Sequence, residues 1–420
     1  MKERAVENKV QRYESYKDSG VEWLGEIPEH WECIRMKRLY ADVSIKNRPN
    51  ELLSSVTQDR GVIPRDWIES RMVMPSGNLD SFKFIEKEDF AISLRSFEGG
   101  LEYCFHDGII SPAYTVLKKK KEDLFPLFYK YLFKSVSFIS ELQTSVVGIR
   151  EGKNISYSEL SYSFLPIPPL QEQTAIAQFL DDKTTKINEA IVIKEQQIKL
   201  LKERKQILIH KAVTQGLNPN VKFKKSGIEW VGEVPEHWEV KNFRYAFKFL
   251  NYKRIPLSGI EREKMQGIYP YYGASGIIDY VDDYIFDEKL ILIAEDGANL
   301  LSKSTPLAFV AEGKYWVNNH AHIIRPLLNG FSYWAEQLSL IDYTVFISGS
   351  AQPKLSRNNL GSVKVIVPSL QDIKEISDYI ETTTDKIDTA ISLKQQEIEK
   401  LKEYKSSLIN SVVTGKVKVC

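Results

Sequence analysis

The stretch LQEQTAIAQFLDDKTTKINEAIVIKEQQIKLLKERKQILIHKAVT (residues 170–214) aligns without a gap to LQDIKEISDYIETTTDKIDTAISLKQQEIEKLKEYKSSLINSVVT (residues 370–414). Neither stretch contains Gly or Pro, and both are rich in the Lys, Glu, Gln, Ile and Leu residues that favour helices. Gly216 and Gly415 then end the pattern. Each stretch therefore predicts one helix of roughly 65 Å at ~1.5 Å per residue, longer than a single small domain needs.

Apolar residues recur along both helices at alternating spacings of four and three, which is the heptad pattern of a coiled coil. Lys194, Lys205, Lys394 and Lys405 stand at seam positions, where we expect them to reach solvent or to specify register and partner. The alternative is an amphipathic helix packed on its own domain, because periods of 3.5 and 3.6 residues separate poorly over a few heptads. Two matched seams in one chain favour an antiparallel coiled coil. The predicted seam residues are Ile187, Ile191, Ile198, Leu201, Leu208, Ile387, Ile391, Ile398, Leu401 and Leu408.

A shorter motif is also repeated. KDSGVEWLGEIPEHWE (residues 17–32) and KKSGIEWVGEVPEHWE (residues 224–239) are identical at 12 of 16 positions. The segments between the repeats barely resemble each other, and their short β-branched or aromatic runs, bounded by Gly, Pro, Asn and Asp, predict strands. The predicted strands are residues 90–94, 109–117, 290–294 and 321–324, and the predicted helices are residues 124–142 and 330–341.

These repeats predict the α+β class, with two mixed α/β modules joined by two long helices and a pseudo-two-fold internal repeat. Four parts follow along the chain. The first module takes residues 1–168 and the second takes residues 218–368. The first long helix, a spacer, occupies residues 169–217, and the second long helix occupies residues 369–420.

The composition excludes several classes of protein. Hydrophobic residues make up 43% of the chain, which argues against disorder. Lys and Arg total 57 against 56 Asp and Glu, so any contact with nucleic acid depends on local patches of charge. Cys33, Cys104 and Cys420 are odd in number and far apart, as in a reducing compartment. With no long apolar run and no secretory segment, we expect a cytoplasmic protein that does not enter a membrane.

The motifs of common catalytic sites are absent from the sequence. His320 and His322 have no further His or Cys at metal-ligand spacing, so a core or loop role is favoured over a metal site. There is no phosphate-binding loop with Lys followed by Ser or Thr, and no dinucleotide-binding glycine motif. There is also no Asn-Pro-Pro or Asp-Pro-Pro turn of the kind used by amino-methylating enzymes. We therefore expect no catalytic residue and no bound metal in this chain.

Several motifs together resemble the specificity subunit of type I restriction-modification systems. They are LPIPPLQEQ at residues 165–173 with a weaker copy at residues 365–372, the long helix after each, and the G-x-x-P-E-H-W motif at residues 25–31 and 232–238. Three further motifs of the second module are similar to target-recognition domains of that family. They are YYGASG at residues 271–276, AEDGAN at residues 294–299 and WVNNHA at residues 316–321.

The resemblance implies a function without catalysis. Each module would be a target-recognition domain that reads one half of a bipartite site in double-stranded DNA. The paired helices would set the gap between the halves and dock two modification subunits. Restriction and translocase subunits would join in the larger complex. S-adenosylmethionine, ATP and Mg²⁺ would then be bound by the partner subunits and not by this chain.

Candidate DNA contacts are loop-borne polar residues near glycines. Arg can grip guanine with two donors and Asn can do the same for adenine, whereas a run of Lys suits phosphate. For every candidate, ordinary solvated surface is the alternative. In the first module the candidates are Arg95, Lys118, Lys119, Lys120, Lys121, Arg150 and Lys153. In the second module they are Lys253, Arg254, Ser275, Asn299, Lys303, Lys354 and Arg357.

Two other functions stay open at this point. A coiled-coil scaffold that joins two partner proteins without binding DNA fits the balanced charge of both modules. Residues 33–165 carry 19 basic and 17 acidic residues, and residues 240–367 carry 14 and 12. A self-contained methyltransferase or nuclease is disfavoured by the absent motifs, and activity of the isolated chain would revive it.

Overall fold

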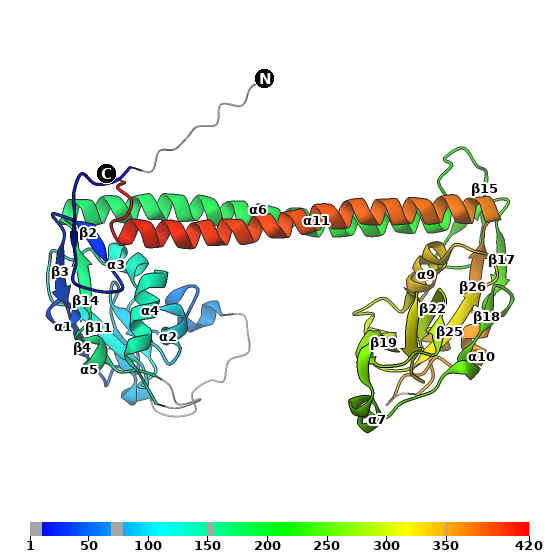
Figure 1. Ribbon diagram of the computed structural model, residues 1–420, viewed down its shortest axis with the longest axis horizontal. Helices are drawn as coiled ribbons and strands as arrows, with labels where there is room; N and C mark the ends of the chain where they lie inside the picture. Colours follow the sequence, from blue (N-terminus) through cyan, green and yellow to red (C-terminus); the bar gives the residue numbers. More distant parts are fainter. Residues whose placement is uncertain (1–10, 69–78, 149–153, 350–351, 420) are drawn as a thin grey trace, which may run out of the picture. The chain divides into compact units, whose positions relative to one another are not determined.

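The computed structural model describes residues 11–68, 79–148, 154–349 and 352–419 (Figure 1). The chain divides into two compact units. The first unit contains residues 1–194 and 396–420, and the second contains residues 195–395. The long helices α6 (Leu170–Gln215) and α11 (Leu370–Val413) each contribute residues to both units. The predicted long helices are thus present, and each unit combines part of both helices with its own strands.

The first unit is built around a four-stranded antiparallel sheet in the order β4-β11-β8-β9. Its strands are β4 (Tyr40–Val43), β11 (Thr115–Lys119), β8 (Phe90–Ile92) and β9 (Glu102–Tyr103). Further strands form two-stranded sheets. Near the ends of the unit's sequence, β1 (Tyr16–Asp18) pairs with β2 (Glu26–Pro28), and β3 (Glu32–Arg35) pairs with β14 (Phe164–Ile167). The other pairs are β5 (Ser54–Thr57) with β6 (Gly61–Pro64), β7 (Lys83–Ile85) with β10 (Gly108–Ile110), and β12 (Val146–Val147) with β13 (Asn154–Ile155). The shorter helices are α1 (Met36–Leu39), α2 (Ser96–Gly99), α3 (Pro126–Leu132), α4 (Val136–Thr144) and α5 (Tyr157–Leu160), with 3-10 turns η1 (Arg65–Trp67) and η2 (Leu79–Ser81).

The second unit repeats this sheet order with β18-β25-β22-β23, again antiparallel. These strands are β18 (Phe247–Phe249), β25 (Ala321–Pro326), β22 (Leu290–Ala294) and β23 (Ala308–Ala311). A second sheet, which the first unit lacks among its described residues, runs β20 (Gly276–Val281), β19 (Gln266–Gly273), β24 (Lys314–Val317), β21 (Phe286–Asp287). The remaining pairs are β15 (Phe223–Lys225) with β16 (Glu233–Pro235) and β17 (Glu239–Asn242) with β26 (Lys364–Val367). The shorter helices are α7 (Gly259–Lys264), α8 (Asn299–Ser302), α9 (Phe331–Leu340) and α10 (Arg357–Ser362), with 3-10 turns η4 (Phe243–Tyr245), η5 (Asn251–Lys253) and η6 (Thr344–Phe346).

The two long helices pack together, and their contacts show the antiparallel direction within each unit. In the first unit, Lys405 Nζ donates to Asn188 Oδ1 at 2.8 Å, and Lys194 pairs with Glu397. In the second unit, Lys205 pairs with Asp388 at 2.8 Å. Residue numbers therefore rise along one helix as they fall along the other. Of the apolar seam positions, Ile187, Ile391 and Ile398 are 7%, 9% and 6% exposed, and the rest are half-buried.

Each unit closes its hydrophobic core with the start of one long helix and the end of the other. In the first unit, Ile176 of α6 and Val413 of α11 join the core around Trp31. In the second unit, Ile373 of α11 and Val213 of α6 join the core around Trp238. Burying a large apolar side chain contributes about 1.5–3 kcal/mol, so these helix ends are fixed mainly by the domain cores.

In each unit the repeated P-E-H-W motif forms a contact with the start of one long helix. His30 Nε2 lies 2.8 Å from Glu172 near the start of α6, and His237 Nε2 lies 2.7 Å from Asp372 near the start of α11. Asp372 also accepts a bond from the Trp238 indole at 3.0 Å, and its own backbone N–H donates to the Ser369 hydroxyl at 3.1 Å. The Ser369 side chain thus caps the first turn of α11.

Candidate functional site

The two four-stranded sheets each end in a cluster of loops at the same topological position. In the first unit β8 ends where β11 begins, because Ile92 pairs with Thr115. In the second unit β22 ends where β25 begins, because Ala294 pairs with Ala321. We call residues 58–60, 93–96 and 114 the first loop edge, and residues 251–255, 295–299, 318–320 and 352–357 the second loop edge. Loops held by a rigid sheet are common positions for binding residues.

The first loop edge encloses a concavity of about 510 Å³. Arg95 is exposed there, as is Gln58, which comes from the turn between β5 and β6. The Gln58 side-chain amide donates to the Arg95 backbone carbonyl at 3.2 Å, so two segments distant in the sequence are joined at this point. The lining residues are Val56, Gln58, Asp59, Ser93, Leu94, Arg95 and Tyr114.

Lys134 anchors the first loop edge to neighbouring parts of the first unit. Lys134 Nζ donates to the backbone carbonyls of Gln58 and Gly99, at 3.0 and 2.8 Å, and to the Glu102 carboxylate at 2.6 Å. Glu102 is fully buried, and burial raises its pKa to about 7, although the charge of Lys134 acts in the opposite direction. A single ammonium therefore ties the β5–β6 turn to α2 and β9.

The lysine run of the first unit does not join this edge. Lys118 and Lys119 lie at the end of β11 that pairs with β4. Lys118 forms an ion pair with Glu86, and the hydrogen bond from that pair raises the pKa of Lys118. Lys119 lies 3.7 Å from Glu88, and Lys120 Nζ donates to the Lys37 carbonyl at 2.7 Å. Lys121 is half-buried next to this end, while Arg150 and Lys153 lie outside the described residues.

The second loop edge is held together by ion pairs. Arg254 donates to Glu295 at 2.5 Å and to the carbonyls of Asn319 and Ala321 at 3.1 and 2.8 Å. Lys354 Nζ lies 3.4 Å from the other oxygen of Glu295. Burial acts to raise the pKa of Glu295, but the bond from Arg254 and the nearby positive charges outweigh it and the pKa is lowered. The Arg254 guanidinium therefore bonds to groups of the protein itself and holds the loops of the second edge together.

The other predicted DNA contacts of the second unit differ in their exposure and in the interactions that they already make with other residues. Ser275 is exposed at the turn between β19 and β20, and Arg357 is exposed with its guanidinium 5.1 Å from the Phe249 ring centre. Asn299 is half-buried and accepts a bond from the Thr305 backbone at 3.0 Å. Lys253 lies 3.8 Å from Glu288, and Lys303 lies 3.4 Å from Asp342. By the definition above, the second loop edge includes Lys253, Arg254, Asn299, Lys354 and Arg357 of these candidates.

The structure adds residues to both edges that were not among the predicted contacts. In the second unit these are Asn319 and His320, and the His320 imidazole is 2.8 Å from Asp296. Both stand inside the WVNNHA motif, so the motif itself is the signal that points to them. In the first unit they are Gln58 and Asp59. These two residues do not lie in a comparable sequence motif, so no such signal points to them.

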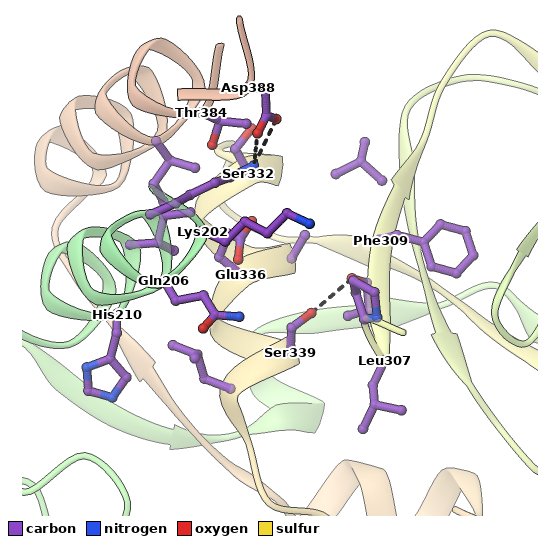
Figure 2. A pocket seen from close by; sticks show the side chains of 18 of the residues that line it. Lys202, Gln206, His210, Leu307, Phe309, Ser332, Glu336, Ser339, Thr384 and Asp388 are labelled. Carbon is purple, nitrogen blue, oxygen red and sulfur yellow. Dashed lines mark hydrogen bonds and ion pairs between the residues drawn. The ribbon is translucent and has the colours of Figure 1, made fainter. Parts of the chain in front are cut away.

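A larger groove lies beside the helix pair in the second unit. Its volume is about 1560 Å³. Figure 2 shows Lys202, Gln206 and His210 of α6 on one side, Leu307 and Phe309 on the other, and Glu336 and Ser339 of α9 between them. Burial raises the pKa of Glu336, and the charge of Lys205 partly offsets this. A groove with apolar, acidic and basic walls suits a polypeptide segment better than a small apolar ligand.

The described part of the chain contains neither a candidate metal site nor a candidate membrane-spanning helix. Within the described ranges, no group of three or more His, Cys, Asp or Glu side chains is arranged to hold a metal ion. In the same part of the chain no helix is long and apolar enough to cross a membrane.

Sequence comparisons point to one family. Residues 235–403 match the family described as type I restriction modification DNA specificity domain. The chain is 25% identical to the putative type I restriction enzyme MjaX specificity subunit of Methanocaldococcus jannaschii, over 94% of this chain and 96% of that protein. It is 22% identical to the type I restriction enzyme MjaVIII specificity subunit of the same organism, over 94% of each.

Two solved structures have a similar fold. The HsdS subunit from Thermoanaerobacter tengcongensis aligns with a TM-score of 0.54 and 14% identity, over 93% of this chain and 98% of that one. A chain solved in work on complex assembly and conformational transition of the type I R-M system aligns with a TM-score of 0.68 and 13% identity, over 92% and 98%. At these identities the likeness concerns the fold.

Proposed function

Because the chain belongs to the family of type I restriction-modification specificity subunits, we propose that it is the DNA-reading subunit of such a complex. Each loop edge binds one half of a bipartite site in double-stranded DNA. The chain acts in the cytoplasm and performs no reaction. Modification subunits supply S-adenosylmethionine and methyl transfer, and restriction and translocase subunits supply ATP- and Mg²⁺-dependent steps.

One observation carries this proposal. The two units present the same sheet order and the same loop edge, yet the side chains on the two edges differ. The first edge offers Gln58, Asp59 and Arg95, and the second offers Asn319, Lys354 and Arg357. Sequence is read by donors and acceptors that match base edges, so one scaffold with two sets of side chains is suited to two different half-sites.

The helix pair has a separate role in the proposal. Continuous helices resist bending, and half-sites on one face of a duplex repeat at ~34 Å per turn, so helix length selects the gap between the halves. The groove beside α6 and α11 in the second unit is the proposed docking surface for a modification subunit. A matched insertion of one heptad in both helices is then expected to lengthen the gap and leave both half-sites unchanged. An unchanged gap would contradict this role.

The test of the function is a methylation map. The chain is purified together with its two modification subunits and incubated with bacterial genomic DNA and S-adenosylmethionine, and methylated adenines are then mapped by sequencing. We expect methylation at one two-part motif with a fixed gap. The alternative of a DNA-independent scaffold requires methylation without a two-part motif, or none that depends on this chain.

A further inference from the structure

We propose that the concavity of the first loop edge is a base-reading site for a G·C pair, in which Arg95 donates to guanine and Asp59 accepts from cytosine. This inference rests on the proposed function and adds to it the site, the residues and the base pair. In the major groove guanine presents the acceptors O6 and N7, and cytosine presents the N4 amino group. The Arg95 guanidinium and the Asp59 carboxylate line the same concavity, and together they match that pattern of acceptors and donor.

The two groups are open to a ligand. The Arg95 guanidinium makes no hydrogen bond or ion pair with other residues in the part of the chain that the structure describes, and Arg95 is exposed. The Asp59 side chain is 80% exposed, and the nearest cation among the described residues is Arg60, whose Nε lies 3.9 Å away. An Arg fork without an internal partner can offer two parallel donors to one base.

The backbone that carries both groups is anchored before any ligand arrives. The Gln58 amide holds the Arg95 backbone carbonyl at 3.2 Å, and Lys134 holds the Gln58 carbonyl from below at 3.0 Å. Asp59 follows Gln58 in the same turn, so its backbone is anchored by the same lysine. A preorganised site loses less conformational entropy on binding than a disordered loop does.

The chemistry favours a base edge over the phosphate backbone. The Asp59 carboxylate lines the same concavity as the guanidinium, and a carboxylate there repels phosphate but accepts a bond from a base amino group. The second loop edge differs in this respect, because its carboxylates Glu295 and Asp296 are already paired with Arg254 and His320. An open carboxylate is thus a property that distinguishes the first edge from the second.

The experiment uses the complex of the full chain with its modification subunits. A plasmid library in which the first half of the methylated motif is randomised is treated, and the methylated fraction is sequenced. For the unaltered chain we expect strong selection of a G·C pair at one position. Arg95→Ala should reduce that discrimination about 10- to 100-fold, and Asp59→Asn should relax selection of the same pair. The second half and the gap should stay unchanged.

Two further variants make the test specific. Arg95→Lys keeps the positive charge but loses the paired donors, so it should retain overall methylation and lose discrimination at that position. Arg38→Ala, an exposed charge in α1 of the same unit, should behave like the unaltered chain. The inference is overturned if Arg95→Ala and Asp59→Asn keep the original motif, if they lower methylation of all sequences equally, or if the first half contains no G·C pair. A complex that methylates no two-part motif would instead overturn the proposed function itself.

Discussion

Lys205 Nζ of α6 lies 2.9 and 2.8 Å from the two carboxylate oxygens of Asp388 of α11. The repeat of this pair in the first unit is Lys405 with Asn188, so the carboxylate is replaced by an amide, whose oxygen is 2.8 Å from the lysine. Burial lowers the pKa of Lys405, and the charge of Lys130 adds to that effect. The lysine at this seam position therefore faces a carboxylate in the second unit and an uncharged amide in the first.

Asn188→Asp should stabilise the first unit. The new carboxylate would face Lys405 with the geometry that Lys205 and Asp388 already show, and a partly exposed pair of this kind contributes about 0.2–1 kcal/mol. The urea midpoint of unfolding is expected to rise at neutral pH, and the gain should disappear in 1 M salt. As a control, Asn188→Asp is also made in a chain that carries Lys405→Met, in which no ion pair can form. An equal gain from Asn188→Asp in that background would show that the ion pair is not the cause.

Gly415→Ala should destabilise the end of α11. Gly415 has φ +74°, and an added Cβ would lie 2.4 Å from Pro28 Cδ. The left-handed backbone alone costs about 1–2 kcal/mol for a residue with a side chain, and the clash adds to it. Gly227→Ala is the control, because Gly227 has φ +71° and no atom within 4 Å of the added Cβ. Equal losses of thermal stability in the two variants would contradict the proposed close packing.

The stability of the first unit should depend on the titration of Glu102. Its pKa rises from an ordinary 4.5 to about 7 because of burial, so the folded chain holds a proton that the unfolded chain releases at lower pH. The unfolded state then binds fewer protons between about pH 4.5 and 7, and the free energy of unfolding falls as pH rises through this window. Glu102→Gln should flatten that slope in urea titrations.

One control variant accompanies this pH series. Glu98→Gln changes an exposed carboxyl of α2 and should keep the original slope. Asp89, whose pKa burial raises to about 6, contributes to the same window and is present in all three proteins. If the slope of Glu102→Gln matches that of the unaltered chain, Glu102 is not held protonated by its surroundings.

Ile207→Glu should weaken assembly with the modification subunit. Ile207 is 66% exposed, lies on α6 and lines the groove of the second unit. A charge placed there would have to be desolvated on docking, but it costs little in the uncomplexed chain. Val345→Glu, at 85% exposure and away from the groove lining, is the control. The measurement is the yield of modification subunit that co-purifies with each variant, once the two variants are shown to have equal melting temperatures. Equal yields for the two variants would exclude the groove as the docking surface.

Much of the fold could be predicted because it depends on local pattern. The heptads and the absence of Gly and Pro predicted α6 and α11, and the apolar run at residues 290–294 is β22. Predictions failed where a polar side chain ends an element. The helix predicted over residues 124–142 is two helices, because the Ser135 side chain accepts from Phe138 N and caps α4. The strand predicted over residues 109–117 is broken between β10 and β11 by the turn that includes Ser111 and Tyr114.

The loop edges were harder to predict, because they depend on pairing between distant segments. Gln58 meets Arg95 only when the β5–β6 turn folds against α2, and no spacing in the sequence encodes that contact. Arg254 looks like a surface cation in sequence, yet its guanidinium is used inside the protein to hold Glu295. Lys118 was predicted as a DNA contact together with Arg95, but it lies toward the end of β11 opposite to Thr115, the residue that pairs with the end of β8.

We propose that the two units read DNA independently. The most direct measurement is to replace residues 33–165 with the matching segment of a relative that methylates a different motif, and to map adenine methylation by the resulting complex. We predict a new first half-site, with the second half-site and the gap retained. A motif that stays the same, or one in which both halves change, would contradict separate reading by the two units.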